Sequence, residues 1–572
     1  MRCDFPSKSY FIIIKDLFFL IAIILISCVF LYKYSDFQFI NGEEYRALPL
    51  LIATTPILAF YALLRLLLNS IKIPALCTIG MSLAISIAHQ KKQALTGAPL
   101  SWSDITNLQN IRIAITYLEW WQISIILVAP LFFGYSIWNS YNNRLRNEKP
   151  AIIFNACVLA ITAIIAFHPY LPNGDLHLKK RATRALQKIG IVYIAFEWNV
   201  NVRQNGIFLH LVQTSRRTIP VKATKKNLEE SQRLPTPPTT IQSPKHVFFI
   251  LCEACWHDEN NFEDIFQPLK EEGFLAMRGT SPAYGGGTVN ATFEMLTALP
   301  ANSALNGVIF QEYAEIIDDD AKTIISAMRK KGFETYSIHN FYRNFWKRPS
   351  VLKKLGFDHF IGIEDMHYNG TMFFPRDKVL FDETLEILQK NSHQHMLFNL
   401  ETVYTHGTYK INNDWGEYDY MTRLRTTIED IKNFVEKARE IDNDALFVIY
   451  GDHKPALTKY FYERGVLKES LFVKTGDKDE DFMFVYDIDQ ELLGDVPVYI
   501  GGGDLPRLRR LKELANGKPL YCLSAMIDRL YLSSGSLASR YAQESICNIY
   551  VRGQYSHFAN MMPDWVYSAS LF

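Results

Sequence analysis

The stretch HVFFILCE, residues 246–253, decides the fold of the larger part of the chain. A short apolar run that stops at a carboxylate is typical of a buried strand that ends at Glu253. Similar runs recur as TYSI (335–338), MLFNL (396–400), ALFVIY (445–450) and VPVYI (496–500), and amphipathic stretches of helical length occupy 264–272, 321–331, 377–390 and 420–440. This alternation predicts an α/β fold with a mostly parallel sheet and helices on both faces.

Polar residues follow three of these strands where each strand ends. Glu253 follows the first strand, and His406 comes shortly after the strand at 396–400. Asp452 and His453 come just after the strand at 445–450. Because ligands bind at the carboxyl ends of strands in open α/β sheets, we expect these side chains to lie close together. Carboxylate and imidazole ligands suit a divalent transition metal.

The loop SPAYGGGT (281–288) lies between the first two strands along the chain. Its glycines would let backbone amides approach an anion, and a hydroxyl held beside a metal, here that of Thr288, would become a nucleophile. No G-K-[ST] follows the glycines, so the loop is not a Walker A motif. Plainer interpretations stay open: a flexible loop, a surface Glu253, and Thr288 as the N-cap of a helix that begins near Val289.

The composition excludes two classes of protein. The chain has 572 residues, with 60 Lys+Arg against 59 Asp+Glu and a net charge of +1, which argues against a nucleic-acid binder. An apolar share of 48% and an aromatic share of 13% exclude a disordered chain. The length predicts two or more domains.

Apolar runs fill the first third of the chain and predict five membrane-spanning helices, each of which needs about 20 residues. They are Phe11–Tyr32, Pro49–Leu68, Pro74–Ala88, Trp121–Trp138 and Ala151–Phe167. The first is too long, and too soon followed by the second, to be a cleaved signal peptide. Buried core helices are the alternative, but runs this long and this uncharged rarely occur outside membranes.

Positive charges orient these helices. Lys and Arg gather before the first run and in alternate loops, at Arg2, Lys8, Lys15, Arg65, Lys72, Arg144, Arg146 and Lys149. The positive-inside rule puts these loops in the cytoplasm and everything after Phe167 outside, with Lys91 and Lys92 as exceptions.

We expect three parts in the chain. They are a transmembrane domain at 1–170, a basic amphipathic surface segment with a Pro/Thr linker at 171–245, and a catalytic domain at 246–572. Residues 176–195 mix Lys and Arg with apolar residues. They would either lie against lipid phosphates or form a solvated connector.

The cysteines suggest neither a disulfide scaffold nor a paired-CxxC zinc site, because their spacings do not repeat. Cys522 and Cys547 would either form a disulfide in the oxidising outer compartment or be two buried free thiols. Cys252 and Cys255 flank Glu253 so closely that we expect them to be free.

Together these features resemble the lipoteichoic acid synthase and phosphoglycerol transferase family, a sulfatase-like branch of the alkaline phosphatase superfamily. The resemblance covers nearly the whole chain and is carried by HVFFILCEA (246–254), SPAYGGGTVNATFEMLTALP (281–300), NFWKR (344–348), HGTY (406–409), YGDHKP (450–455) and LTGAPLSWSDI (95–105). It implies a helical membrane domain of five spans followed by an α/β sulfatase-like extracytoplasmic domain.

The resemblance also implies roles for single residues. Glu253, Thr288, Asp452 and His453 match the metal ligands, and Thr288 matches the nucleophile. Trp346, Arg348 and His406 match residues that contact the head group. The metal implied is one divalent ion, Mn²⁺ first and Zn²⁺ second.

The implied reaction moves phosphoglycerol or phosphoethanolamine from a membrane phospholipid to an envelope glycan or glycolipid, through a phospho-threonine. The implied location is the cytoplasmic (inner) membrane, with several spans and the catalytic domain outside. The sequence departs from the family at Ala254, where Ser is frequent, and in the less polar residues after Thr288, which concerns the acceptor. No C-x-P-S-R motif for a formylglycine is present, so sulfate ester hydrolysis is not expected.

Three alternatives stay open. A lipopolysaccharide-core phosphoethanolamine transferase would share the spans and the Thr nucleophile, although lipid A-modifying members continue Asp-His with Gly, where this chain has Lys454-Pro455. A non-catalytic sulfatase-like membrane scaffold is disfavoured because all four ligand positions are intact. A transporter is disfavoured because we expect no intramembrane charge pair.

Overall fold

The computed structural model describes residues 7–35, 37–106, 149–167, 198–235 and 241–572, together with Gly134, Trp138 and Ile191. Short gaps within these ranges fall at 38–39, 42–43, 46, 69, 97–98, 216–219, 302, 306, 315, 475–476, 478–481 and 485–488. The chain forms two compact units. The membrane unit comprises Met1–Ala94 and Ala98–Arg216, and the globular unit comprises Leu95–Gly97 and Arg217–Phe572.

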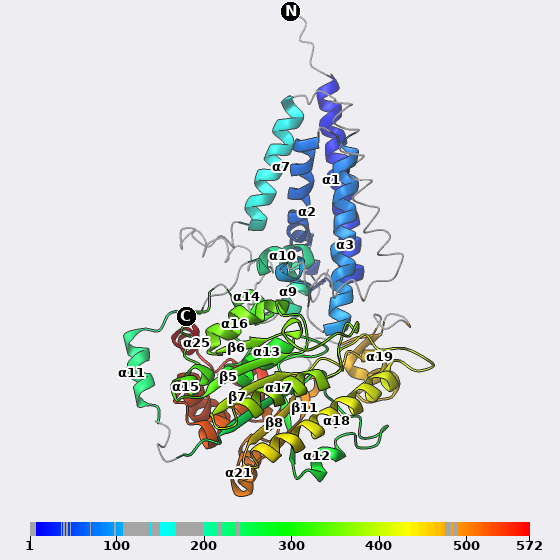
Figure 1. The fold of residues 1–572 in the computed structure, drawn as a ribbon. Helices are drawn as coiled ribbons and strands as arrows, with labels where there is room; N and C mark the ends of the chain where they lie inside the picture. Colours follow the sequence, from blue (N-terminus) through cyan, green and yellow to red (C-terminus); the bar gives the residue numbers. More distant parts are fainter. Residues whose placement is uncertain are drawn as a thin grey trace, which may run out of the picture. The chain divides into compact units, whose positions relative to one another are not determined.

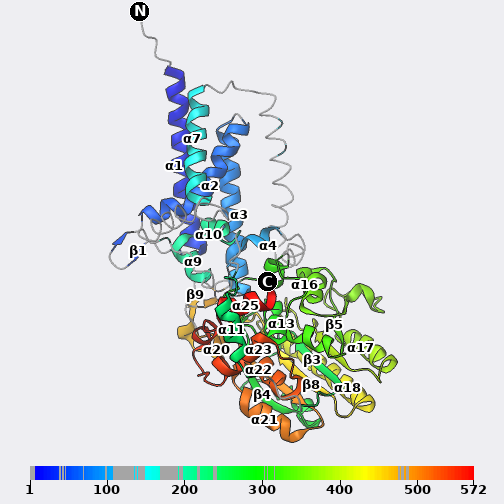
Figure 2. The same ribbon diagram turned by 90° about the vertical axis from the view of Figure 1, so that its left-hand side faces the viewer.

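Four long apolar helices run alongside one another in the membrane unit: α1 (Ser7–Ser35), α2 (Ala47–Leu68), α3 (Lys72–Thr96) and α7 (Lys149–Phe167) (Figures 1 and 2). Among the described residues, these four are long and apolar enough to cross a membrane. They correspond to the first, second, third and fifth predicted spans. The predicted span Trp121–Trp138 lies almost wholly outside the described residues, as does most of the segment 176–195.

A buried polar cluster joins three of these helices. Asp16 of α1 accepts hydrogen bonds from Arg65 Nε (2.9 Å) and Tyr61 hydroxyl (3.2 Å), both in α2, and from Asn155 Nδ2 (3.0 Å) in α7. The expectation that the spans hold no charge pair is therefore wrong. A single Asp in an apolar run gives no signal for its partner, because Arg65 lies 49 positions away.

The described part of the membrane unit also contains short elements. They are β1 (Ile40–Asn41), β2 (Glu44–Tyr45), α4 (Trp102–Thr106), α9 (Trp198–Asn205) and α10 (Ile207–Thr214). Pro56 interrupts α2, where it leaves the carbonyl of Ile52 without its helical partner. Thr55 Oγ1 donates to that carbonyl at 2.7 Å, which compensates for the missing amide.

An eight-stranded sheet organises the globular unit. Its order is β12 (Lys518–Pro519), β4 (Leu275–Thr280), β11 (Asp495–Gly501), β8 (Leu446–Gly451), β3 (His246–Cys252), β7 (Met396–Glu401), β5 (Glu334–His339) and β6 (His359–Ile361). β11 is antiparallel to both of its neighbours, and all other pairs are parallel. The sheet is therefore mixed, with the predicted parallel strands β8, β3, β7 and β5 at its centre.

Helices cover both faces of this sheet (Figure 1). One face carries α12 (Gln267–Glu271), α17 (Lys378–Lys390) and α18 (Glu417–Ile441), and the other carries α13 (Thr288–Thr297), α15 (Ile324–Lys330), α21 (Leu505–Ala515) and α22 (Leu520–Ile527). Successive side chains of β3 alternate between the two cores: Phe249 packs with the second group of helices, and Phe248 packs with the first. This period of two explains why β3 reads as a continuous apolar run.

The remaining elements surround this core: α11 (Lys225–Arg233), α14 (Ile309–Tyr313), α16 (Arg348–Leu355), α19 (Thr458–Glu463), α20 (Gln490–Leu493), α23 (Leu537–Ala542), α24 (Tyr555–Ala559), α25 (Asp564–Leu571) and the hairpin β9 (Phe472–Lys474) with β10 (Phe482–Phe484). All five predicted strands and all four predicted helices are present, although α12 is shorter than predicted. The strands β4, β6 and β12 were not predicted. β4 is partly exposed and carries Arg278, so it lacks an apolar run.

Candidate active site

The site begins where β3 ends. Glu253 follows the strand, and its backbone is held from both sides by residues after β7: its N–H donates to Thr402 Oγ1 (2.8 Å), and its carbonyl accepts from Thr405 Oγ1. Cys252 and Cys255 form a disulfide across the turn that contains Glu253, so the expectation of two free thiols is wrong. The two cysteines are three positions apart, and the tight turn between them brings their sulfur atoms together.

The glycine loop lies beside this turn. Gly285, Gly286 and Gly287 have φ of 63°, 157° and 90°, which favour glycine. Gly287 is the N-cap of α13, and Thr288 is the first helical residue. The interpretation of Thr288 as N-cap is therefore wrong by one position. This shift frees its hydroxyl, which donates to Glu253 Oε2 at 3.0 Å instead.

Asp452 and His453 enter from the end of β8. Gly451 precedes them at a point where a Cβ would lie 2.5 Å from the carbonyl oxygen of Cys255, so only glycine lets β8 approach the turn. Asp452 Oδ1 then accepts from Ala254 N at 2.7 Å. The side chains of Glu253, Asp452 and His453 are buried, and one ligand atom of each lies within 4.8 Å of the others.

These residues fit a divalent cation. Asp452 Oδ2 and His453 Nε2 are buried without a hydrogen-bond partner and lie 3.2 Å apart, and His453 Nε2 is 3.5 Å from Glu253 Oε1. His453 Nδ1 is 2.8 Å from the carbonyl oxygen of Lys454, which fixes the proton there and leaves Nε2 as a ligand. Burial, followed by the Asp452 carboxylate, raises the pKa of Glu253, and burial raises that of Asp452. A cation would relieve this crowding of carboxylates.

The guanidinium of Arg348 is already paired with a carboxylate and is not a free anion-binding group. It is buried, and its Nε and Nη2 both donate to Glu401 Oε2, at 2.9 and 2.7 Å. Its guanidinium carbon lies 5.3 Å from the ring centre of Trp346, which is half-buried with φ of 54°. Its positive charge opposes the rise in the pKa of Glu253, so Arg348 acts on the metal-ligand group electrostatically.

His406 is half-buried and stacks on Phe374, with ring centres 4.4 Å apart. Its Nδ1 lies 2.8 Å from the carbonyl oxygen of Gly407. Burial lowers the pKa of His406 to about 4, with His453 and two arginines contributing. The imidazole is therefore neutral at neutral pH, and its Nε2 is a hydrogen-bond acceptor.

Sequence reasoning missed several polar residues around this group. Glu401 is the last residue of β7, and His339 is the last residue of β5 and donates from Nδ1 to the carbonyl of Glu401 at 2.8 Å. Both stand at carboxyl ends of parallel strands, where the strand-end rule would have found them. Asp377 gave no such signal. It accepts from Val403 N (2.8 Å) and Thr427 Oγ1 (2.7 Å), which anchors the segment before His406.

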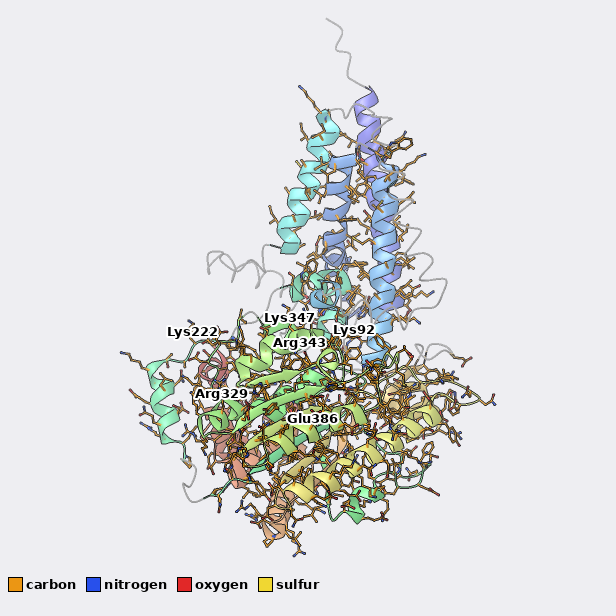
Figure 3. The ribbon with its side chains drawn as sticks, in the orientation of Figure 1. Lys92, Lys222, Arg329, Arg343, Lys347 and Glu386 are labelled. Carbon is orange, nitrogen blue, oxygen red and sulfur yellow. A yellow bond between two sulfur atoms is a disulfide. The ribbon has the colours of Figure 1, made fainter. Side chains whose placement is uncertain are left out.

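A second group of possible ligands, His367, Glu383 and Glu386, lies on the surface of the globular unit; Glu386, on α17, is labelled in Figure 3. His367 is 89% exposed on its side chain, so solvent competes for this group. The buried group of Glu253, Asp452 and His453 is therefore the stronger candidate cation site among the described residues.

Comparison with known families bears on this arrangement. Residues 269–479 match the sulfatase family. The globular unit is therefore a sulfatase-like α/β domain. The match includes Thr288, Asp452 and His453 and begins after Glu253.

Individual proteins are similar to this chain at lower identity. A Rhizobium meliloti (strain 1021) protein, described provisionally as a cyclic beta-1,2-glucan modification protein, is 23% identical over a 443-residue alignment that covers 71% of this chain and 67% of that protein. The Streptococcus pyogenes phosphoglycerol transferase GacH in complex with sn-glycerol-1-phosphate is 17% identical and covers 61% of this chain and 95% of its own, with a TM-score of 0.40. The lipoteichoic acid synthase LtaP from Listeria monocytogenes is 15% identical, covers 55% and 82%, and has a TM-score of 0.39.

Proposed function

We propose that this protein is a membrane phosphotransferase that moves a phospholipid head group onto an extracytoplasmic glycan or glycolipid. The observation that carries the proposal is the Thr288 hydroxyl, 3.0 Å from Glu253 Oε2 and at the first residue of α13. An anion is stabilised at a helix N-terminus, so a phosphoryl group beside Thr288 would meet the positive end of the helix.

The metal ligands in this proposal are Glu253, Asp452 and His453, with Thr288 as the fourth. Mn²⁺ is the first choice and Zn²⁺ the second, because two carboxylates, one imidazole and one hydroxyl oxygen suit either ion. When bound, the ion supplies positive charge that acidifies a hydroxyl and neutralises phosphoryl oxygens.

Two displacements at phosphorus complete the transfer. Thr288 Oγ1 attacks the phosphodiester of the donor lipid, the bond from phosphorus to the diacylglycerol oxygen breaks, and diacylglycerol leaves with a proton. The hydroxyl of the acceptor then attacks the phospho-threonine, the bond from phosphorus to Thr288 breaks, and the threonine hydroxyl is restored. His406, neutral at neutral pH, accepts a hydrogen bond from a hydroxyl of the head group.

Phosphoglycerol is the head group that we favour over phosphoethanolamine. An ammonium group would need a free carboxylate or an open aromatic face. The Trp346 ring already has the Arg348 guanidinium 5.3 Å from its centre, and Glu401 is fully buried and paired with Arg348. A phosphoethanolamine transferase acting on a lipopolysaccharide core is the alternative.

The acceptor is a glycan of the cell envelope in this proposal. The R. meliloti relative is described in terms of a cyclic beta-1,2-glucan, which supports a glucan acceptor. The apolar helices place the protein in a membrane, and we propose the inner membrane with the globular unit outside. The buried cluster of Glu253, Asp452 and His453 argues against a non-catalytic scaffold.

The test uses the full-length protein in phosphatidylcholine vesicles that contain labelled phosphatidylglycerol or phosphatidylethanolamine. Release of diacylglycerol and labelling of an added glucan are measured, with Thr297→Ala as a control from the same helix. Mass spectrometry of envelope glycans from a deletion strain gives the second readout. Loss of a glycerol-phosphate adduct supports the proposal, loss of an ethanolamine-phosphate adduct supports the alternative, and unchanged glycans reject both.

A further inference from the structure

Glu401 joins two parts of the proposed site. Its side chain is fully buried at the end of β7. Oε2 accepts both Nε and Nη2 of Arg348, while Oε1 accepts from Thr292 Oγ1 (3.3 Å) and Asn399 Nδ2 (3.0 Å). One carboxylate therefore holds a residue of the head-group region with one oxygen and a residue of α13 with the other.

The two ends of this link reach residues with proposed roles. Thr292 lies one helical turn after Thr288, and residues four apart share a face of a helix. At the other end, Arg348 lies over the rings of Phe345 and Trp346, at 5.7 and 5.3 Å from the guanidinium carbon to the ring centres. Glu401 thus connects the helix of the nucleophile with the arginine and tryptophan of the head-group site.

The hydrogen bonds of Arg348 set the orientation of its guanidinium. Nε and Nη2 both donate to one carboxylate oxygen, Glu401 Oε2. Nη1 donates to the carbonyl oxygen of Phe345 at 3.4 Å. Charge-assisted hydrogen bonds are strong and directional, so loss of Glu401 would free the guanidinium to turn away from this orientation.

We propose that Glu401 is a positioning residue of the phosphotransfer site. It holds Arg348 in the orientation that the head group needs, and through Thr292 it fixes the helix that begins at Thr288. This inference rests on the proposed function.

A double-mutant cycle tests the first half of the inference. Glu401→Gln, Arg348→Gln and the pair are made in the full-length protein, and the affinities for sn-glycerol 1-phosphate and phosphoethanolamine are measured, with diacylglycerol release as a second readout. We expect Glu401→Gln to weaken glycerol phosphate binding about tenfold when Arg348 is present, and to have no further effect when it is Gln, since residues in contact are coupled. Equal losses in both backgrounds would overturn the inference.

Folding is controlled within the same set. Glu401→Gln leaves a buried guanidinium unpaired, so we expect it to lower the melting temperature. The double variant removes both charges of this pair and should regain stability. If the single variant does not fold, the comparison is between the double variant and Arg348→Gln alone, which should bind equally, and weaker binding by the double variant would overturn the inference.

Thr292 tests the second half. Thr292→Val removes the hydroxyl and keeps the shape, and we expect kcat for diacylglycerol release to fall several-fold with KM for the donor unchanged, while Thr292→Ser restores kcat. Thr297→Val is the matched control, because its hydroxyl donates to the carbonyl of Phe293 within α13 (2.7 Å), and it should alter stability only. A fall in kcat for both valine variants would overturn the inference.

Failure of the proposed function would look different. Glycerol phosphate binding that shows the Glu401–Arg348 coupling, without any diacylglycerol release by the wild type, would reject phosphotransfer and retain the positioning role. If the wild type releases diacylglycerol normally but the losses of affinity in Glu401→Gln and Arg348→Gln simply add, phosphotransfer is retained and the positioning role is rejected. A wild type that binds neither head-group phosphate would overturn both.

Discussion

Thr288 and Glu253 are 35 positions apart, and the threonine hydroxyl donates to the carboxylate at 3.0 Å. The contact joins the first residue of α13 to the residue after β3. It places a hydroxyl, unreactive by itself, within the group of residues that fits a cation.

Thr288 is expected to be indispensable for transfer. Thr288→Ala should abolish diacylglycerol release, while Thr288→Ser should retain part of it, because only the serine keeps a nucleophilic oxygen. The lost hydrogen bond should cost about 1–3 kcal/mol of stability at most. Wild-type protein incubated with donor lipid and no acceptor should yield a phosphorylated peptide containing Thr288. Near-normal transfer by Thr288→Ala would reject the covalent route.

Asp452 should control metal content. Asp452→Ala is expected to lower metal affinity by more than the roughly 10–100-fold typical of a residue that only supports a ligand. Elemental analysis of purified protein after dialysis measures this without an activity assay. Glu386→Ala, in the exposed group on α17, is the control and should leave the metal content unchanged. Full occupancy in Asp452→Ala would show that the ligand set is wrong.

The cysteines of the globular unit should resist labelling. Cys522 and Cys547 are both buried and form a disulfide with Cα atoms 5.5 Å apart. Closing a loop of this length stabilises a protein by about 3 kcal/mol, so Cys522→Ser should lower stability by about that amount. In denatured, unreduced protein, a thiol reagent should reach Cys28, Cys77 and Cys157. Labelling of all four cysteines of the globular unit would contradict both disulfides.

The pair of Asp16 and Arg65 should matter for assembly of the membrane unit. Asp16→Asn removes the carboxylate that accepts from Arg65 in this buried cluster and is expected to cost about 3–5 kcal/mol. Adding Arg65→Gln should recover most of this loss, because neither charge of the pair then remains. Thermal unfolding in detergent micelles measures the effect. Lys33→Gln, at an exposed position of α1, should change stability by less than about 0.5 kcal/mol, and an equal loss there would show that the pair is not special.

Glu294 should make stability depend on pH. Burial raises its pKa to about 8, from an ordinary value of 4.5. The folded state therefore binds more protons than the unfolded state between these values, so the contribution of Glu294 to stability is fully present below pH 4.5 and is lost as the pH rises to about 8. Glu294→Gln cannot titrate and should flatten this slope, measured by unfolding across the pH range. Glu440→Gln, exposed on α18, should keep the slope, and a slope unchanged by Glu294→Gln would reject this origin.

The sequence alone determined five of the eight strands of the sheet and the edge at which the site lies. The apolar runs at 246–251 and 445–450 form β3 and β8. Both faces of these strands are covered, so every side chain is buried and the local sequence is a continuous apolar run. The same rule brought Glu253, Asp452 and His453 together, since the carboxyl ends of neighbouring parallel strands meet. The membrane-spanning helices could also be predicted from local sequence, because a run of about 20 apolar residues is enough to predict each one.

Only the tertiary structure decided which polar groups pair. Arg348 and Glu401 are 53 positions apart, and Asp16 and Arg65 are 49 apart; no periodicity links either pair. The antiparallel β11, inserted between β4 and β8, has the same apolar pattern as a parallel strand. Periodicity records which side chains are buried, whereas the partner of a buried charge depends on how distant elements pack. A charged group that is removed from water needs an oppositely charged or hydrogen-bonding partner, and the packing of distant elements determines which residue that partner is.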